Sequence, residues 1–249
     1  YAEQLVAAVK RGDVAVATID KAVRRILSLK FQMGLFDDPF VDEKQAVQLV
    51  ASSEHTGLAR EVARQSIVLL KNKDKLLPLK KDIRTLAVIG PNADNVYNML
   101  GDYTAPQADG TVVTVLDGIR QKVSKETRVL YAKGCAVRDS SRTGFKDAIE
   151  TARNADTVVM VMGGSSARDF SSEYEETGAA KVTINQISDM ESGEGYDRAT
   201  LHLMGRQLEL LEEISRLGKP VVLVLIKGRP LLMEGAIQEA EAIVDAWYP

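Results

Sequence analysis

The stretch that decides the fold is TVVMVMGG, residues 157–164, an unbroken apolar run that ends in two glycines. A second run of the same kind, VVLVLI, occupies residues 221–226. Continuously apolar strands, rather than strands that alternate apolar and polar residues, are typical of a parallel sheet covered by helices on both faces. We therefore expect these two runs to be central strands of such a sheet.

Shorter β-branched runs and amphipathic stretches extend this pattern in both directions. Further strands are predicted at residues 66–70, 85–90, 128–131 and 242–246, and helices at residues 112–123, 145–154 and 206–217. Strands that alternate with helices in this way favour parallel pairing, because the returning helix packs on the sheet. The predicted fold class is α/β, with a mostly parallel sheet sandwiched by helices.

The first forty residues follow a different, wholly helical pattern. Apolar residues recur at helical spacing up to Gly34, with Thr18 or Asp20 placed to cap the second helix. Residues 35–40 contain a proline and two acids and read as a linker, and a third helical stretch is expected at residues 43–64.

Composition excludes several classes of function. The 249 residues contain 32 Lys and Arg against 35 Asp and Glu, a net charge of −3, and only 5% are aromatic. A nucleic-acid partner is not expected, because such proteins gain affinity by neutralising phosphates with basic residues. No apolar run is long enough to span a membrane, so no membrane partner is expected either. With Cys135 as the single cysteine, a disulfide framework and a multi-cysteine zinc site are also excluded.

One segment breaks the rhythm of strands and helices. About forty residues rich in Ser, Asp, Glu and Gly separate the strand at 157–163 from the helix near Arg206, far more than the usual ~4–6. The segment leaves the carboxyl end of a strand, where open α/β sheets place their ligands. It carries several carboxylates, namely Glu173, Glu175, Glu176, Asp189, Glu191, Glu194 and Asp197.

Glu194 stands out among these carboxylates because a glycine lies on each side of it, in Gly193-Glu194-Gly195. Glycine adopts backbone angles closed to other residues, so this tripeptide can form a tight, exposed turn that aims one carboxyl outward. Such a turn suits a general acid/base. On composition alone, a solvated acidic loop is the more frequent explanation of such a segment.

The remaining candidates favour structural roles. The turns at residues 90–94 (GPNAD) and 163–166 (GGSS) lack the spacing of a nucleotide-binding loop. They are expected to be ordinary turns after strands or, failing that, turns that line a ligand cleft. His55 and His202 belong to no metal motif, so neither a metal nor a cofactor is expected. Asp197 and Arg198 are expected to form a local ion pair that braces the loop. Cys135 is expected to be a small buried residue, and Trp247 suits the core or the edge of a cleft equally well.

Several separated motifs point together to one family. SGEGYDRAT at 192–200 resembles the acid/base loop of glycoside hydrolase family 3, the β-glucosidases, β-xylosidases and their relatives. The other motifs similar to this family are, in order, DKAVRRIL at 20–27, MGLF at 33–36, ARQSIVLLKN at 63–72, LLPL at 76–79, AVIGPNA at 87–93, GDY at 101–103, GRPL at 228–231 and AWYP at 246–249. Together they cover essentially the whole chain.

The resemblance implies a division into domains. Members of the family pair a TIM-like barrel with a second α/β sandwich domain, and the active site lies between the two. Residues 1–40 would then be the last helices of the barrel and a linker, and residues 41–249 the sandwich domain, truncated at its C-terminal end. The barrel and its nucleophilic Asp would precede residue 1.

The resemblance also implies a function. The parent protein would be a retaining, exo-acting β-glycosidase, in which Glu194 is the general acid/base of a double displacement. Its substrate would be an oligosaccharide or another β-glycoside, its location periplasmic or secreted, and the fragment alone would be inactive. Exposed helices and an unpaired sheet edge would favour self-association. The alternative is a carbohydrate-binding relative that has lost its chemistry, although the carboxyl on so specific a turn favours the enzyme.

Overall fold

The computed structural model describes residues 2–167 and 189–249. The chain divides into two compact units, Tyr1–Ala59 and Arg60–Pro249. This division describes compactness only. The predicted boundary after residue 40, between the last helices of a barrel and the sandwich domain, stays a prediction. Within the described residues, no helix combines the length and the apolar character that a membrane crossing requires.

The first unit is built from helices. The four N-terminal helices are α1 (Ala2–Arg11), α2 (Val16–Gln32), α3 (Glu43–Leu49) and α4 (Ser53–Ser66), the last of which runs on into the second unit. None of the four contains a buried residue.

Two details of these helices differ from the sequence prediction. Helix α2 begins at Val16 after Ala15, which caps it without a side-chain hydrogen bond. The prediction of Thr18 or Asp20 as the cap was therefore wrong: both residues lie inside the helix, and the Thr18 amide already bonds to the Ala15 carbonyl. The predicted helix at 43–64 is broken in two because Ala51 has a positive φ of 54°.

The second unit contains a six-stranded sheet in the order β1-β6-β5-β4-β2-β3. Its strands are β1 (Val68–Asn72), β2 (Thr85–Ile89), β3 (Arg128–Ala132), β4 (Thr157–Gly163), β5 (Val221–Ile226) and β6 (Ala242–Trp247). Only β1 is antiparallel to its neighbour, and every other pairing is parallel. The predicted α/β class and the mostly parallel sheet are confirmed.

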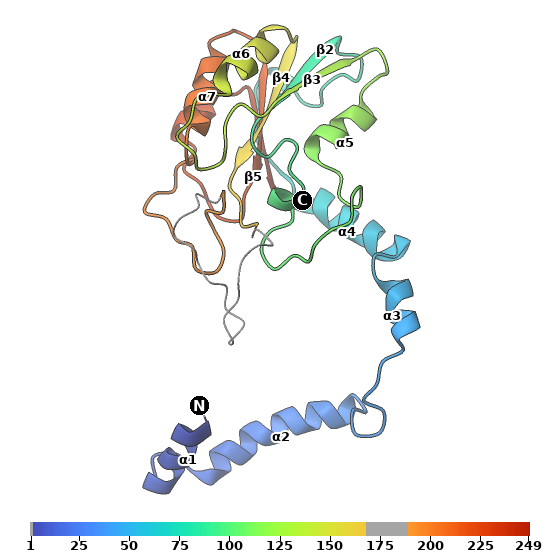
Figure 1. Cartoon of the computed structure of the whole chain (residues 1–249), viewed down its shortest axis with the longest axis vertical. Helices are drawn as coiled ribbons and strands as arrows, with labels where there is room; N and C mark the ends of the chain where they lie inside the picture. Colours follow the sequence, from blue (N-terminus) through green and yellow to red (C-terminus); the bar gives the residue numbers. More distant parts are fainter. Residues whose placement is uncertain (1, 168–188) are drawn as a thin grey trace. The chain divides into compact units, whose positions relative to one another are not determined.

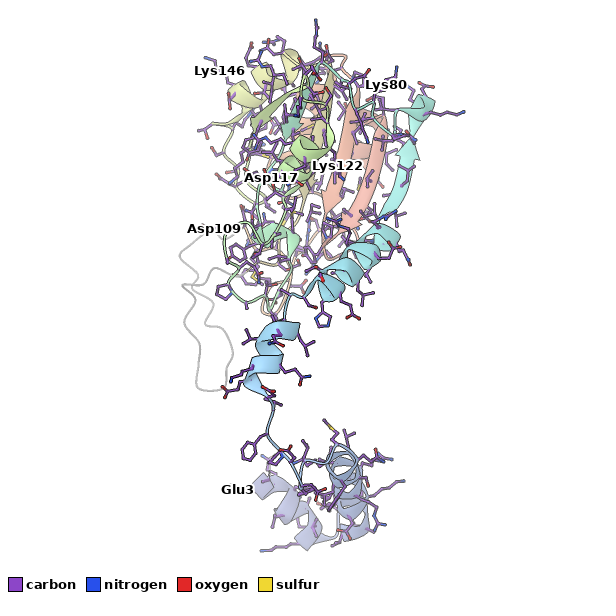
Figure 2. The ribbon with its side chains drawn as sticks, turned by 90° about the vertical axis from the view of Figure 1, so that its right-hand side faces the viewer. Glu3, Lys80, Asp109, Asp117, Lys122 and Lys146 are labelled. Atoms are coloured by element: carbon purple, nitrogen blue, oxygen red, sulfur yellow. The ribbon has the colours of Figure 1, made fainter. Side chains whose placement is uncertain are left out.

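Helices cover both faces of this sheet (Figure 1). Helices α6 (Phe145–Arg153) and α7 (Gln207–Ser215) lie on one side together with the short α8 (Glu234–Glu239), and α5 (Val115–Lys122) lies on the other. The helices present charge outward, as the exposed Lys122 of α5 and Lys146 of α6 illustrate (Figure 2).

The position of β4 in the sheet accounts for its almost continuously apolar sequence. All seven of its residues are buried. Val158, Met160 and Met162 pack into the cluster beneath α6 and α7, whereas Val159 and Val161 pack into the cluster beneath α5. Since successive side chains of a strand point to opposite faces, a strand covered on both sides is apolar along most of its length, and its one polar side chain, Thr157, is at its first position.

Candidate active site

The described ends of the long segment after β4, residues 164–167 and 189–200, lie at the carboxyl edge of the sheet, where β2 and β5 also end. Asn92 is fully buried there and joins three segments. Its side-chain amide donates to the carbonyl of Gly164 at 2.9 Å, and its side-chain oxygen accepts from the Asn98 amide at 2.8 Å. Asn98 in turn accepts from the Ser165 hydroxyl at 2.7 Å. A buried polar network therefore fixes the start of the segment.

The same network fixes the residues that lead to Glu194. The Ser165 carbonyl accepts hydrogen bonds from the backbone amides of Glu191 at 2.8 Å and Ser192 at 3.3 Å. Two residues before Glu191, the Asp189 carboxylate accepts hydrogen bonds from the backbone amides of Val137 at 3.0 Å and Arg138 at 3.3 Å. The two described ends of the segment are thus held together at the sheet edge.

Residues 193–196 form the tight turn expected around Glu194. The Tyr196 amide donates to the Gly193 carbonyl at 3.2 Å. Gly193 and Gly195 have positive φ angles of 105° and 80°, which residues with a side chain rarely adopt. A Cβ at Gly193 would also lie 2.7 Å from a carboxylate oxygen of Asp102. Both glycines are required by the backbone, and the turn leaves the Glu194 side chain exposed.

Asp102 and Tyr103 contact the Glu194 turn. Both lie in the loop that follows the 3₁₀ turn Tyr97–Met99. One Asp102 oxygen accepts from the Tyr103 amide at 2.9 Å and the other from the Glu194 amide at 3.2 Å. The Tyr103 hydroxyl donates to the Glu194 carboxylate. Nothing in the residue pattern predicts this contact across 91 positions; the family resemblance of GDY at 101–103 is the signal that could have pointed to it.

Glu191 lies in the opposite environment to Glu194. Its side chain is fully buried and forms an ion pair of 2.5 Å with Arg198, whose side chain is 3% exposed. The predicted pairing of Asp197 with Arg198 was therefore wrong. Arg198 reaches inward to Glu191, whereas Asp197 stays 95% exposed, 3.7 Å from Arg229.

The other candidates do not gather at this turn. Glu173, Glu175 and Glu176 lie outside the described residues. His55 lies on α4, and the His202 carbonyl accepts a hydrogen bond from Arg198. No group of three His, Cys, Asp or Glu side chains suited to a metal ion occurs in residues 2–167 and 189–249.

The glycine turns after β2 and β4 do not offer free amides to a phosphate. The Gly90 amide donates to Ala132 and the Gly164 amide to Ile226, both backbone carbonyls. The Gly163 amide donates to the side chain of Gln207 at 2.8 Å. The amides of these three glycines are therefore used in hydrogen bonds within the domain.

Cys135 and Trp247 also have defined places. Cys135 is buried. This burial is the main cause that raises the pKa of its thiol to about 12, and the nearby Asp189 carboxylate is the second cause. Trp247 ends β6 with a positive φ of 58° and is 40% exposed. The Lys227 ammonium lies 4.1 Å from the centre of its ring, so the indole forms part of the carboxyl edge rather than of the core.

Fold and site together define an α/β sandwich domain that presents the Glu194 carboxyl on a hydrogen-bonded turn at the carboxyl edge of its sheet. Residues 67–249 match the glycosyl hydrolase family 3 C-terminal domain. The chain belongs to glycoside hydrolase family 3.

Named relatives agree with this assignment. The chain is 39% identical to a β-xylosidase from Formosa agariphila, over 92% of the chain and 29% of the relative. It is 34% identical to a periplasmic β-glucosidase from Salmonella typhimurium, over 100% of the chain and 32% of the relative. The chain thus spans about a third of the length of these proteins.

Solved structures show the same fold. A β-glucosidase from Erythrobacter marinus superposes with a TM-score of 0.76 at 35% identity, covering 98% of this chain and 33% of that one. A β-glucosidase from Listeria innocua, solved in complex with glucose, superposes with a TM-score of 0.75 at 27% identity, covering 98% of this chain and 30% of that one.

Proposed function

We propose that this chain is part of a retaining, exo-acting β-glycosidase and that Glu194 is its general acid/base. The observation that carries the proposal is the contrast between two carboxyls three positions apart. Glu191 is buried in an ion pair, whereas Glu194 is exposed on a turn that two glycines and Asp102 hold in place. Of these two carboxyls, only that of Glu194 can be approached by a glycosidic oxygen.

The proposed reaction is a double displacement. A carboxylate nucleophile, expected on a barrel domain that precedes these residues, attacks the anomeric carbon while Glu194 gives its proton to the departing glycosidic oxygen. Glu194 then removes a proton from water, whose oxygen attacks the anomeric carbon and releases the nucleophile. The two carboxyl groups of such enzymes lie about 5–5.5 Å apart.

The neighbours of Glu194 suit this role as positioning residues. Asp102 accepts a backbone amide with each carboxylate oxygen, one of them that of Glu194, so it holds the turn in place. Tyr103 reaches the Glu194 carboxylate through its hydroxyl. A carboxyl held from its backbone and from its tip loses little freedom when substrate binds.

The substrate class follows from the relatives. Their names include β-xylosidase and β-glucosidase, and the Listeria enzyme was solved with glucose. We therefore propose a terminal β-linked xylosyl or glucosyl residue as the group removed. The periplasmic β-glucosidase of Salmonella supports an exported parent protein.

Replacement of Glu194 in the full-length protein tests the proposal. Glu194→Ala should lower kcat/KM for phenyl β-glycosides by ~10²–10⁴-fold, because their leaving groups need protonation. Dinitrophenyl glycosides need no such help, so they should still form the glycosyl-enzyme, and azide should then restore turnover by attacking it without a general base.

Asp197→Ala is the matched control, since Asp197 is an exposed carboxyl on the same loop. It should keep the wild-type dependence on leaving group and show no response to azide. If Glu191→Ala shows the leaving-group dependence and the azide rescue while Glu194→Ala behaves as wild type, the assignment is wrong.

The 249-residue chain by itself should not hydrolyse aryl β-glycosides. A double displacement without its nucleophile cannot form the covalent intermediate. Turnover by the purified chain that disappears on replacing one of its own carboxylates would show that the nucleophile lies within it.

A further inference from the structure

The turn that carries Glu194 is closed at its base by a buried ion pair. Glu191 precedes the turn and Arg198 follows it, seven positions later. Their charged groups lie 2.5 Å apart, with exposed fractions of 0% and 3%. Residues 191–198 therefore form a short loop whose two ends are joined by Glu191 and Arg198 and whose tip is Glu194.

Arg198 also joins this loop to the chain that follows it. Its Nε donates to the Thr200 carbonyl at 2.7 Å, and its Nη2 donates to the carbonyl of His202. One guanidinium thus bonds to Glu191 before the turn and to two backbone carbonyls after it. The planar group can do this because its donors have a fixed geometry.

Stability alone does not account for this arrangement. The second oxygen of Glu191, Oε1, is buried without a hydrogen-bond partner, and so is Nε of Arg229, which lies 4.0 Å from Oε2 of Glu191. Buried ion pairs with incomplete hydrogen bonding contribute little to folding, since the desolvation of the charges offsets their attraction. A role in fixing the geometry of the loop explains the pair better.

Gly164 shows how closely the Glu191 carboxylate is enclosed. A Cβ on Gly164 would lie 1.8 Å from Oε1 of Glu191. The end of β4 therefore leaves room for this carboxylate and for nothing more. The ion pair therefore lies directly against the residues that follow β4, and the Glu191 amide is bonded to the Ser165 carbonyl there.

We propose that Glu191 and Arg198 are a positioning pair that sets the direction of the Glu194 carboxyl. The inference rests on the proposed function of Glu194 and adds to it two residues that do not touch substrate. Loss of the pair should leave the carboxyl present but misplaced. A displacement of about 1 Å can cost ~10²-fold in rate, and this loss should fall on the step that needs the proton.

The experiment compares Glu191→Ala with Asp245→Ala in the full-length enzyme. Asp245 forms another buried ion pair, 2.7 Å from Lys227, and this pair does not flank the Glu194 turn. The side chains of Lys227 and Asp245 are 5% and 7% exposed. The measured quantity is the ratio of kcat/KM for a dinitrophenyl glycoside to that for a phenyl glycoside. The thermal midpoint of each variant is recorded beside it.

Glu191→Ala should raise this ratio by about 10- to 100-fold, because only the phenyl substrate depends on a well-placed proton donor. Asp245→Ala should lower the thermal midpoint and reduce both rates by one common factor. Glu191→Gln, which keeps an oxygen that can accept from Arg198, should recover part of the loss and serves if the alanine variant does not fold. Azide should accelerate these variants far less than it accelerates Glu194→Ala, since Glu194 is still present.

An unchanged ratio in both Glu191→Ala and Glu191→Gln would overturn the positioning role. The Glu194→Ala variant separates this failure from failure of the proposed function. If Glu194→Ala shows leaving-group dependence and the Glu191 variants do not, only the positioning pair is refuted. If Glu194→Ala itself shows none, the assignment of Glu194 fails first.

Discussion

Gln207 shows at the residue scale how a buried polar side chain can be fully satisfied. Its side-chain oxygen accepts from the Gly163 amide, and its side-chain nitrogen donates to the carbonyls of Gly163, Val137 and Met204 at 2.8–3.2 Å. It thereby fixes the end of β4, from which the candidate active-site segment departs.

Gln207→Leu should destabilise the domain by about 3 kcal/mol, because it leaves one backbone amide and several carbonyls buried without their partner. Urea denaturation measures the loss. Gln121→Leu, at an exposed position of α5, is the control and should change the unfolding free energy by less than about 0.5 kcal/mol. Equal effects of the two substitutions would contradict the role given to Gln207.

Cys135 should be chemically silent in the folded chain. Because the pKa of its thiol is raised to about 12, almost no thiolate exists at pH 8, and a disulfide reagent such as dithionitrobenzoate should react only after unfolding. From about pH 9 upward the unfolded chain loses this proton first. It then binds fewer protons than the folded chain, so the free energy of unfolding should fall as the pH rises.

Unfolding in urea at several pH values between 8 and 11 measures this fall. Cys135→Ala should show a shallower decline than the parent chain, whatever its stability at pH 8. Equal slopes for the two chains, or rapid labelling of the native thiol, would contradict the burial of Cys135.

The two carboxyls of the candidate site illustrate what sequence can predict for single residues. The glycines beside Glu194 predict the turn on which it lies, because they report a backbone requirement that is local. The burial of Glu191 is not local: it depends on Ser165 and Gly164 at the end of β4 and on Arg198. Adjacency in the sequence suggested Asp197 as the partner of Arg198, but the Arg198 side chain is buried against Glu191 while Asp197 stays exposed.

At the scale of elements, strands were predicted best where both faces are covered. The predicted and observed bounds agree at β4 and β5, whose long apolar runs have no other explanation. Strand β1 begins at Val68 rather than residue 66, because α4 continues through Ser66. Helix α8 has only six residues and was missed, since one and a half turns are too few to show a helical period.

Helix α5 offers a substitution that should strengthen one element. Gly118 lies inside α5, and a Cβ there would meet its nearest neighbour, Val113, at 3.8 Å, an ordinary contact. Gly118→Ala should therefore stabilise the domain by about 0.5–1 kcal/mol through helix propensity. The thermal midpoint should rise.

Gly144, just before α6, is the matched control. A Cβ there would lie 2.4 Å from the Gly134 carbonyl oxygen, so Gly144→Ala should lower the thermal midpoint. If both alanines stabilise, or Gly118→Ala destabilises, the packing described around these helices is wrong.

At the scale of the whole molecule, the two units differ in what holds them. Both clusters of buried apolar residues belong to Arg60–Pro249. Helices α1 to α4 contain no buried residue. The cooperative unfolding transition should therefore belong to the second unit, because burial of apolar surface is the main source of stability.

The same contrast predicts where the chain associates with itself. Helix α2 leaves large apolar side chains exposed, among them Val16, Ile26, Leu29 and Phe31 at 56–66%. Exposed apolar surface of this kind favours contacts between copies. The full chain should sediment partly as dimers or larger species at high concentration.

A variant that begins at Ser52 tests both expectations. It keeps α4 and the bond from the Thr56 amide to the Ser52 carbonyl but lacks α1 to α3. Its thermal midpoint should stay within about 3 °C of that of the full chain, since a loss of under 1 kcal/mol shifts a domain of this size by only ~2–4 °C. In sedimentation it should be monomeric.

The exposed edge of β1 is an alternative surface for self-association, and the Ser52 variant distinguishes it from α2. Among the strands of residues 2–167 and 189–249, β1 pairs with β6 alone, and it exposes Val68, Leu69 and Leu70 at 43–53%. An unpaired strand edge can join a second copy. If the Ser52 variant associates as strongly as the full chain, the contact lies on this edge and not on α2. A full chain that stays monomeric at high concentration would refute both surfaces. A midpoint lowered by more than about 10 °C in the variant would show that the first unit supports the core, against the absence of buried residues in its helices.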